Sequence, residues 1–426
     1  KYSKMTLLYF LNLIIYVFLE CYCPVYLSKK MGLGIVSPIT IVAYSTLPII
    51  LFKAFIGPAF LLNDGLFNKY YNYAILMTSI ALLGKFFLIK YSILFFKRYK
   101  ITRSIANSFS PHWHIAPKRL FIAATILLLM GFFCFLLVAT HSYGVINWIL
   151  DPRTGYQLHR TGAGQFFALA ILFYSIAFTI FTIYIKKDIN VLFCILGFII
   201  LVYFLGTKDV ILSFGITGIV ILWFRKSKYF YKTLYFGIPA IFLLMLLNFG
   251  SANLEEVASY FDYYTNSAMY YEEYFNGGIN LFHGELFLTS FWEVVPRALY
   301  PEKPFVYGFL IVNEHFFPGM AEATNTPAFG GPVGAFADWG IIGVLTSSFL
   351  DYHFVFELFL YYYLFKNCNL EHIKKSPFLL YCLIILFAPA FMKYIGFPLN
   401  LILWIFIVKI ISISNRIIIR FNHATT

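Results

Sequence analysis

The residues best suited to chemistry are cationic, and two of them lie in one proline-rich segment. This segment, Val295-Pro296-Arg297-Ala298-Leu299-Tyr300-Pro301-Glu302-Lys303-Pro304, contains three prolines that restrict the backbone to an extended path. A guanidinium and an ammonium on a restricted backbone suit a pyrophosphate, because Arg offers a planar fork of donors and Lys a point charge. In the alternative interpretation, Arg297 pairs with Glu293 or Glu302 and only stabilises the loop.

A second cationic segment reads Asp-Pro-Arg-Thr-Gly and contains Arg153, with Arg160 shortly after it. Ten residues separate Arg153 from Gly164, and ten separate Arg297 from Gly308. At ordinary glycine usage the nine arginines should give about 0.6 such pairs by chance. The two observed pairs are a modest excess over this number and favour a shared role for Arg153 and Arg297. In the alternative interpretation, Arg153 is a loop residue that lies among lipid headgroups.

Transfer of a sugar from a pyrophosphate also needs a base for the acceptor hydroxyl. The candidates are carboxylates and imidazoles that are close together in sequence: His283, Glu285, Glu314 and His315. For each of them the alternative is a solvated or structural side chain, and Glu314 and His315 are preferred. Asp338 is predicted either to cap the helix that it opens or to serve the active site.

No metal or cofactor is predicted. The sequence contains neither His-x3-His nor His-Glu-x-x-His, which are the spacings typical of zinc sites. Lys208-Asp209, at a short turn between two apolar runs, is expected to form a local ion pair, and a role in the site is the alternative.

Composition indicates which elements must position these residues. The chain has 426 residues, of which 61% are hydrophobic and 12% charged, and its mean hydropathy is +0.77. Soluble domains carry about 25% charged residues, so the chain is predicted to be a membrane protein. Its net charge of +13 does not indicate nucleic acid, because no basic recognition motif is present.

A membrane-spanning helix needs about 20 apolar residues. The sequence predicts an all-α polytopic membrane protein with about 11–12 transmembrane helices. The apolar runs are 5–27, 35–61, 72–96, 120–141, 165–185, 189–206, 209–224, 233–250, 335–365, 377–395 and 398–413.

Lys and Arg predict the orientation of these helices. One arrangement places 19 of the 32 basic residues in the cytoplasm and eight outside, a bias typical of cytoplasmic loops. It predicts three parts: 1–250 with eight helices and a short external loop at 140–164, a long external loop at 251–334, and C-terminal helices with a cytoplasmic tail at 335–426. The same arrangement places the N-terminus outside.

The long loop differs in composition from the rest of the chain. The interval from Asn248 to Gly343 holds 11 of the 19 acidic residues but only two basic ones, together with many aromatic residues. These features predict a packed, substrate-holding structure. Its tyrosine cluster, 260–274, is predicted either to stack on sugar rings or to form an interfacial aromatic belt.

These motifs resemble those of bacterial O-antigen and capsule repeat-unit polymerases of the Wzy type, which carry paired Arg-x10-Gly motifs in two periplasmic loops. The resemblance extends to Pro296-Arg297-x-x-Tyr300-Pro301-x-Lys303-Pro304 and to Ala337-Asp338-Trp339-Gly340-x-x-Gly343. It covers about 80 residues by specific motifs, and most of the chain by hydrophobic layout. An even helix count with an inside N-terminus would fit this family better than eleven predicted passes.

The resemblance implies an inner-membrane glycosyltransferase that polymerises repeat units carried on undecaprenyl pyrophosphate, with its active site in the periplasm. It implies substrate contacts from Arg153 and Arg297 and no cofactor; a chain-length-determining co-polymerase is a further candidate partner. Other candidate substrate-binding residues are Arg160, Gly164, Glu285, Tyr300, Lys303, Gly308 and Asp338. The alternative functions are an O-antigen ligase, which uses the same donor, and a flippase or transporter of lipid-linked oligosaccharide.

Overall fold

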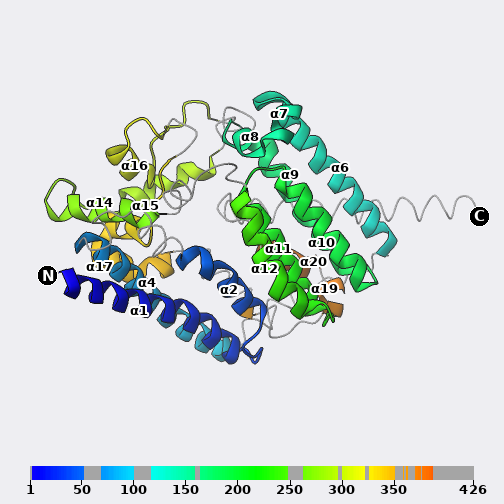
Figure 1. Ribbon diagram of the computed structural model, residues 1–426, viewed down its shortest axis with the longest axis horizontal. Helices are drawn as coiled ribbons and strands as arrows, with labels where there is room; N and C mark the ends of the chain where they lie inside the picture. Colours follow the sequence, from blue (N-terminus) through cyan, green and yellow to red (C-terminus); the bar gives the residue numbers. More distant parts are fainter. Residues whose placement is uncertain are drawn as a thin grey trace, which may run out of the picture. The chain divides into compact units, whose positions relative to one another are not determined.

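A computed structural model describes residues 2–51, 69–99, 117–158, 164–247, 262–295, 300–321, 326–350, 358, 361–362, 370–375 and 377–386. The described residues form helices and no strand (Figure 1), which confirms the all-α class. Two compact units share the chain: residues 1–99 with 249–362, and residues 100–248 with 363–426. The three-part topological division stays a prediction.

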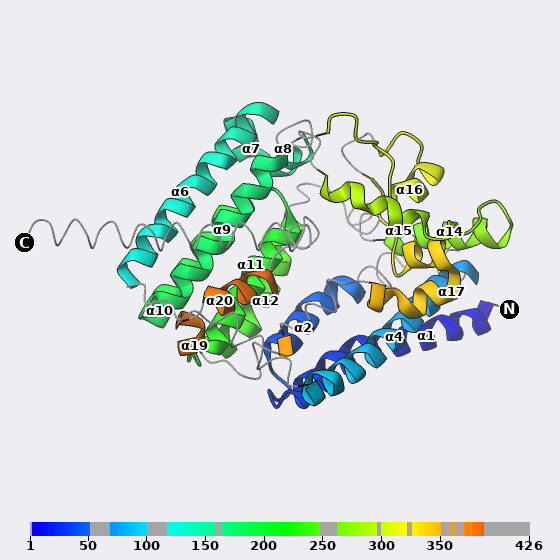
Figure 2. The ribbon, with the colours of Figure 1, turned by 180° about the vertical axis from the view of Figure 1, so that it is seen from behind.

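The first unit combines N-terminal helices with the predicted long loop. Its helices are α1 (Tyr2–Lys30), α2 (Pro38–Leu51), α4 (Lys69–Tyr99), α14 (Tyr263–Phe275), α15 (Glu285–Thr289), α16 (Leu310–Phe316) and α17 (Val333–Leu350), with a 3-10 helix, η3 (Ser290–Val294). Helix α4 packs against α1, α14 and α17. Figure 2 shows α17 alongside α4, and at Gly84 the two approach so closely that a Cβ atom would lie 2.4 Å from the Leu345 carbonyl oxygen.

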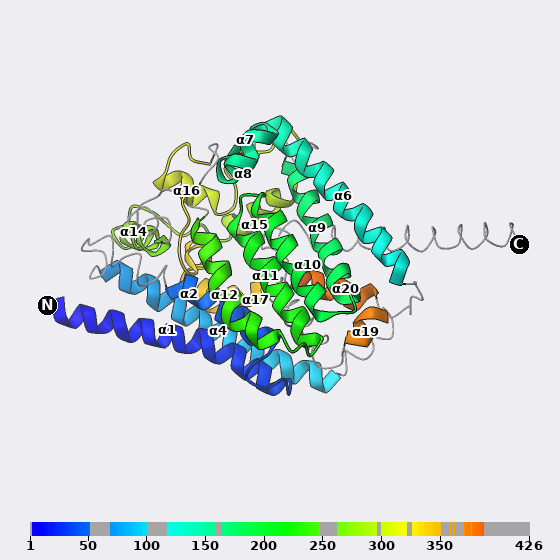
Figure 3. The same ribbon diagram turned by 45° about the vertical axis from the view of Figure 1, so that its right-hand side comes forward.

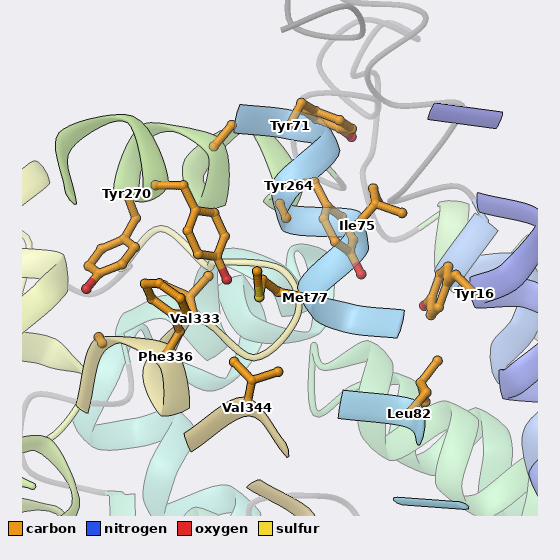
Figure 4. Packing of buried hydrophobic residues seen from close by; sticks show 14 of the residues in the cluster. Tyr16, Tyr71, Ile75, Met77, Leu82, Tyr264, Tyr270, Val333, Phe336 and Val344 are labelled. Carbon is orange, nitrogen blue, oxygen red and sulfur yellow. The ribbon is translucent and has the colours of Figure 1, made fainter. Parts of the chain in front are cut away.

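Aromatic side chains from the long loop form much of this unit's core (Figure 4). Tyr264, Tyr270 and Tyr271 are at least 96% buried, and the Tyr271 ring lies 5.0 Å from that of Phe336. Both predictions for the tyrosine cluster were therefore wrong for these three residues. They anchor the loop to the membrane helices, because burial of large rings against α4 and α17 offers more stabilisation than exposure at an interface.

Helix α17 contains a break where the predicted 335–365 span begins. Gly340 has φ +61° and ψ −146°, which no helical residue adopts. This conformation is accessible to glycine because it lacks a Cβ atom. The Ala337-Asp338 pair therefore lies on a short helical piece before the apolar stretch continues.

The second unit is a bundle of apolar helices. It contains α6 (Pro117–Ser142), α7 (Val145–Leu150), α8 (Pro152–Leu158), α9 (Gly164–Tyr184), α10 (Asp188–Tyr203), α11 (Lys208–Phe224), α12 (Phe230–Leu247), α19 (Leu370–Lys375) and α20 (Pro377–Leu386). Figure 3 shows α6, α9 and α10 side by side, with α9 the most buried. At the end of α9, Arg225 donates hydrogen bonds to the Thr182, Ile183 and Lys186 carbonyls and pairs with Asp188 at 2.9 Å.

Four helices among the described residues are long and apolar enough to cross a membrane: 7–30, 69–96, 119–142 and 164–184. They match four of the predicted runs within about three residues. Large apolar side chains such as Leu129, Phe133 and Ile14 are exposed on them, as expected where lipid is the solvent. The chain is thus a multi-pass membrane protein, and the count of 11–12 passes stays a prediction.

Candidate active site

The first unit contains an open groove of about 670 Å³, within the usual size range of ligand sites. Residues 278–283 line it together with Glu285, Val306, Ile311, Glu314 and His315. All four candidate bases from the sequence therefore line one groove. The remaining lining is mostly apolar, which suits the C–H faces of sugar rings.

One wall of the groove is formed by the segment that comes after α14 in the sequence, and the backbone dihedral angles of this segment are unusual. His283 has φ +50° and Gly284 has φ +96°, so two consecutive residues adopt the left-handed region before α15 begins at Glu285. A non-glycine residue in this region costs free energy and persists only where its surroundings hold it. A second wall is α16, which carries Glu314 and His315.

Asp338 holds the strained wall in place. Its Oδ1 accepts hydrogen bonds from the Gly284 N–H at 3.1 Å and the Leu286 N–H at 3.0 Å, and its Oδ2 accepts one from the Phe287 N–H at 2.7 Å. The Ala337 carbonyl adds a bond from the Phe282 N–H at 2.8 Å. Asp338 was expected either to cap its own helix or to serve the active site. The prediction that Asp338 caps its own helix was wrong, because its carboxylate instead caps the N-terminus of α15. The N–H groups in the first turn of a helix attract an anion.

One carboxylate oxygen of Glu314 accepts no hydrogen bond from the part of the chain that the structure describes. Its Oε1 accepts a hydrogen bond from the Gly319 N–H at 2.8 Å, which restricts the side chain. Its Oε2 is shielded from solvent and has no hydrogen-bond partner among the described residues. His315, the next residue, is exposed on the same groove. An anchored carboxylate with one unused oxygen is suitable as a general base.

Arg297 lies outside the described residues, but both ends of its loop are held. Before it, the Val295 carbonyl accepts a hydrogen bond from the Lys303 Nζ at 3.1 Å. After it, the Tyr300 ring stacks on that of Trp292 at 5.4 Å. The Lys303 ammonium is buried and also lies 4.7 Å from the centre of the Tyr307 ring. Lys303 therefore braces the loop, whatever substrate contacts it also makes.

The glycines that follow the two arginines have different surroundings. Gly308 has φ +54°, its N–H donates to the Thr289 Oγ1 at 2.9 Å, and a Cβ atom there would lie 2.8 Å from the Ser290 Oγ. Gly164 opens α9, and among the described residues no heavy atom beyond its chain neighbours and its own helix backbone lies within 4 Å of an added Cβ atom. Their assignment as substrate-binding residues stays a prediction.

We expect Gly308→Ala to lower the free energy of unfolding by about 1–3 kcal/mol, since Ala is strained at positive φ and would contact Ser290. Gly164→Ala is the matched control and should be neutral or slightly stabilising, because Ala is the better helix former. Thermal unfolding of both purified variants in detergent measures the difference. Equal melting temperatures would contradict the structural role of Gly308.

Arg153 lies in the second unit, where Trp148 and Gly206 position its helix. The Trp148 Nε1 donates to the Phe204 carbonyl at 2.7 Å, and Gly155 in α8 packs on the buried indole ring. Gly206 has φ +71°, and a Cβ atom there would lie 1.9 Å from the Pro152 carbonyl oxygen. Helix α8 therefore rests directly on the turn between α10 and α11.

This contact brings Arg153 close to Lys208, the first residue of α11. Lys208 is only 8% exposed, whereas Asp209 beside it is exposed. Burial, and then the Arg153 charge, lower the pKa of Lys208 to about 6. The sequence indicated Lys208 as half of an ion pair, with a role in the site as the alternative; its position directly before an apolar run was the one signal of partial burial. Arg160 lies outside the described residues.

Within the part of the chain that the structure describes, no three His, Cys, Asp or Glu side chains converge as metal ligands would. The arrangement offers instead a carboxylate and imidazoles at a groove in one unit, and two cations at a helix turn in the other. A groove of this kind can deprotonate a hydroxyl, and cations can stabilise a phosphate leaving group.

Comparison with known proteins identifies relatives. No family model and no solved structure matches the chain. The chain is 29% identical over 288 residues to an O-antigen polymerase of Salmonella typhimurium (strain LT2), and equally to one of Salmonella typhi. Each match covers 65% of this chain and 68% of the relative. These similarities support the resemblance that the motifs indicated, because the relatives that the chain resembles are O-antigen polymerases.

Proposed function

We propose that the protein is a glycosyltransferase that polymerises oligosaccharide repeat units into O-antigen or capsular polysaccharide. Its substrates are repeat units linked to undecaprenyl pyrophosphate, and its active site faces the periplasm from the inner membrane. The similarity to two O-antigen polymerases supports the reaction class and favours a polymerase over an O-antigen ligase or a flippase. The positive charge of the predicted cytoplasmic loops supports the orientation.

The observation that carries a catalytic role is the groove that contains Glu314. In the proposed reaction, a sugar hydroxyl of the incoming repeat unit attacks the anomeric carbon of the growing chain. The bond from that carbon to the pyrophosphate oxygen breaks, and its electron pair leaves with undecaprenyl pyrophosphate. The Glu314 carboxylate takes the hydroxyl proton when substrate binding displaces the side chains that shield its Oε2, which has no partner among the described residues, while Oε1 stays bonded to the Gly319 N–H.

The leaving group carries away negative charge, so cations must stabilise it. We assign this role to Arg153 and Arg297, as the family resemblance implies, with Arg160 as an additional candidate. Lys303 and the Trp292–Tyr300 stack hold the described residues on either side of the segment that contains Arg297. A restricted guanidinium lowers the barrier more than a flexible one, because its orientation is fixed before the reaction starts.

We expect Arg153→Ala and Arg297→Ala each to shorten or abolish polymer, with about a 10²–10³-fold loss of rate, because removal of one preorganised charge partner has that effect. The length distribution of lipopolysaccharide on a gel, at matched protein level, is the measurement. Arg98→Ala is the control, since Arg98 is exposed near the end of α4. Normal polymer from both variants would remove the proposed mechanism.

A further inference from the structure

Two cations from separate segments meet at one corner of the second unit. Arg153 belongs to α8, and Lys208 opens α11. The Pro152 carbonyl lies against Gly206, two residues before Lys208, at a separation that leaves no room for a Cβ atom. This backbone contact therefore fixes the positions of the Cα atoms of Arg153 and Lys208 relative to each other.

Neither of these side chains extends freely into solvent. Lys208 is buried, and Arg153 is half-buried with its guanidinium carbon 5.4 Å from the centre of the Tyr156 ring. Tyr156 in turn packs against Phe167 of α9, with ring centres 5.5 Å apart. An aromatic face next to a guanidinium restricts its orientation, as in many Arg sites for planar or anionic groups.

A buried lysine and a half-buried arginine carry like charges and disfavour each other. Burial and the Arg153 charge both lower the pKa of Lys208 and so oppose its charged form. A strongly shifted group beside a specific charge is typical of a functional site. An oxyanion between the two cations would reverse this effect, because it attracts both and restores the charged lysine.

We propose that Arg153 and Lys208 together bind the diphosphate of the lipid-linked substrate, Arg153 as a fork and Lys208 as a point charge. The first N–H groups of α11 provide further donors, since its N-cap residue Thr207 makes no side-chain cap bond and the helix has 17 residues. The inference rests on the proposed function, and it adds Lys208 as a substrate-binding residue.

The test is binding of radiolabelled farnesyl pyrophosphate to the full-length protein in phosphatidylcholine nanodiscs. Lys208→Met keeps the length of the side chain and removes its charge, so we expect affinity to fall by about tenfold or more, the effect of losing one charge-assisted hydrogen bond. Lys187→Met is the matched control, because Lys187 is the N-cap of α10, within one position of the place that Lys208 has in α11, but is exposed. Its affinity should equal that of the wild type.

Two further measurements keep the result interpretable. Lys208→Met should melt no lower than the wild type without ligand, since it removes a buried cation next to Arg153; binding loss is then not unfolding. Lys208→Arg should retain most of the binding. Replacement of phosphatidylcholine by phosphatidylglycerol should leave probe binding intact, whereas displacement by that lipid would identify a phospholipid headgroup site and overturn the assignment.

Wild-type affinity in Lys208→Met, or no probe binding by the wild type, would also overturn the inference. The assay requires no polymerisation, so the two proposals fail separately. If Lys208 proves irrelevant to binding while Arg153→Ala still abolishes polymer, the proposed function stands. If the probe binds as expected while Arg153→Ala makes normal polymer, the cation site stands without the proposed function.

Discussion

Glu314→Gln is expected to lower the rate of polymer formation by about 10²–10⁴-fold, the usual effect of losing a general base. The substitution keeps the shape of the side chain, and the amide oxygen can still accept the hydrogen bond from the Gly319 N–H. Only the ability of the second oxygen to take a proton is lost. Incorporation of a lipid-linked repeat unit into polymer by the purified protein measures the rate.

Glu272→Gln is the control for this substitution, because Glu272 is exposed on α14 and does not line the groove. It should polymerise like the wild type. Substrate binding by Glu314→Gln should stay within about threefold of the wild type, since a base acts mainly on the chemical step. Normal polymerisation by Glu314→Gln together with a large loss in His315→Gln would transfer the role of base to His315.

Asp338→Ala is expected to have the largest structural effect in the first unit. The substitution removes the acceptor of three backbone N–H groups near α15. In the wild type, two of these groups donate to the buried Oδ1 of Asp338 and the third donates to its Oδ2. Loss of such a buried, charged acceptor should lower the free energy of unfolding by about 3 kcal/mol or more. Polymerisation should also be lost, because His283 and Glu285 flank the released helix start.

Asp338→Asn separates the hydrogen bonds from the charge. Its one acceptor oxygen can keep part of the bonding, so the loss of stability should be smaller than for Ala. Hydrogen exchange at the amides of Gly284, Leu286 and Phe287 should rise in both variants, and more in Ala. Unchanged exchange in Asp338→Ala would show that the carboxylate does not hold this wall.

The class of the protein could be predicted from the sequence because hydropathy is a local property. Runs 120–141 and 165–185 correspond to α6 and α9 within a few residues, since about 20 apolar residues must form a helix to satisfy their backbone groups in lipid. The resemblance to O-antigen polymerases could also be recognised from the sequence, because the Arg-x10-Gly spacing and the proline-rich segment lie within short stretches of chain.

The roles of single residues in the loop could be predicted only in part. His283, Glu285, Glu314 and His315 were selected by residue type and by their closeness in sequence, and the structure places all four at one groove. Asp338 was noticed at the start of a helix, but its partners lie more than 50 positions earlier in the chain. A residue that caps the helix it precedes can be recognised from its type and position in the sequence. A residue that caps a helix elsewhere in the chain leaves no such local pattern.

By itself, then, the sequence determined an α-helical membrane protein that resembles O-antigen polymerases, with cationic and acidic residues in predicted external loops. Only the tertiary structure decided that Tyr270 and Tyr271 are core residues, that Asp338 holds α15, and that Lys208 meets Arg153. The physical reason is that these outcomes depend on close approaches between distant segments, such as Gly206 against Pro152. Such contacts follow from the packing of whole helices, which residue order alone does not specify.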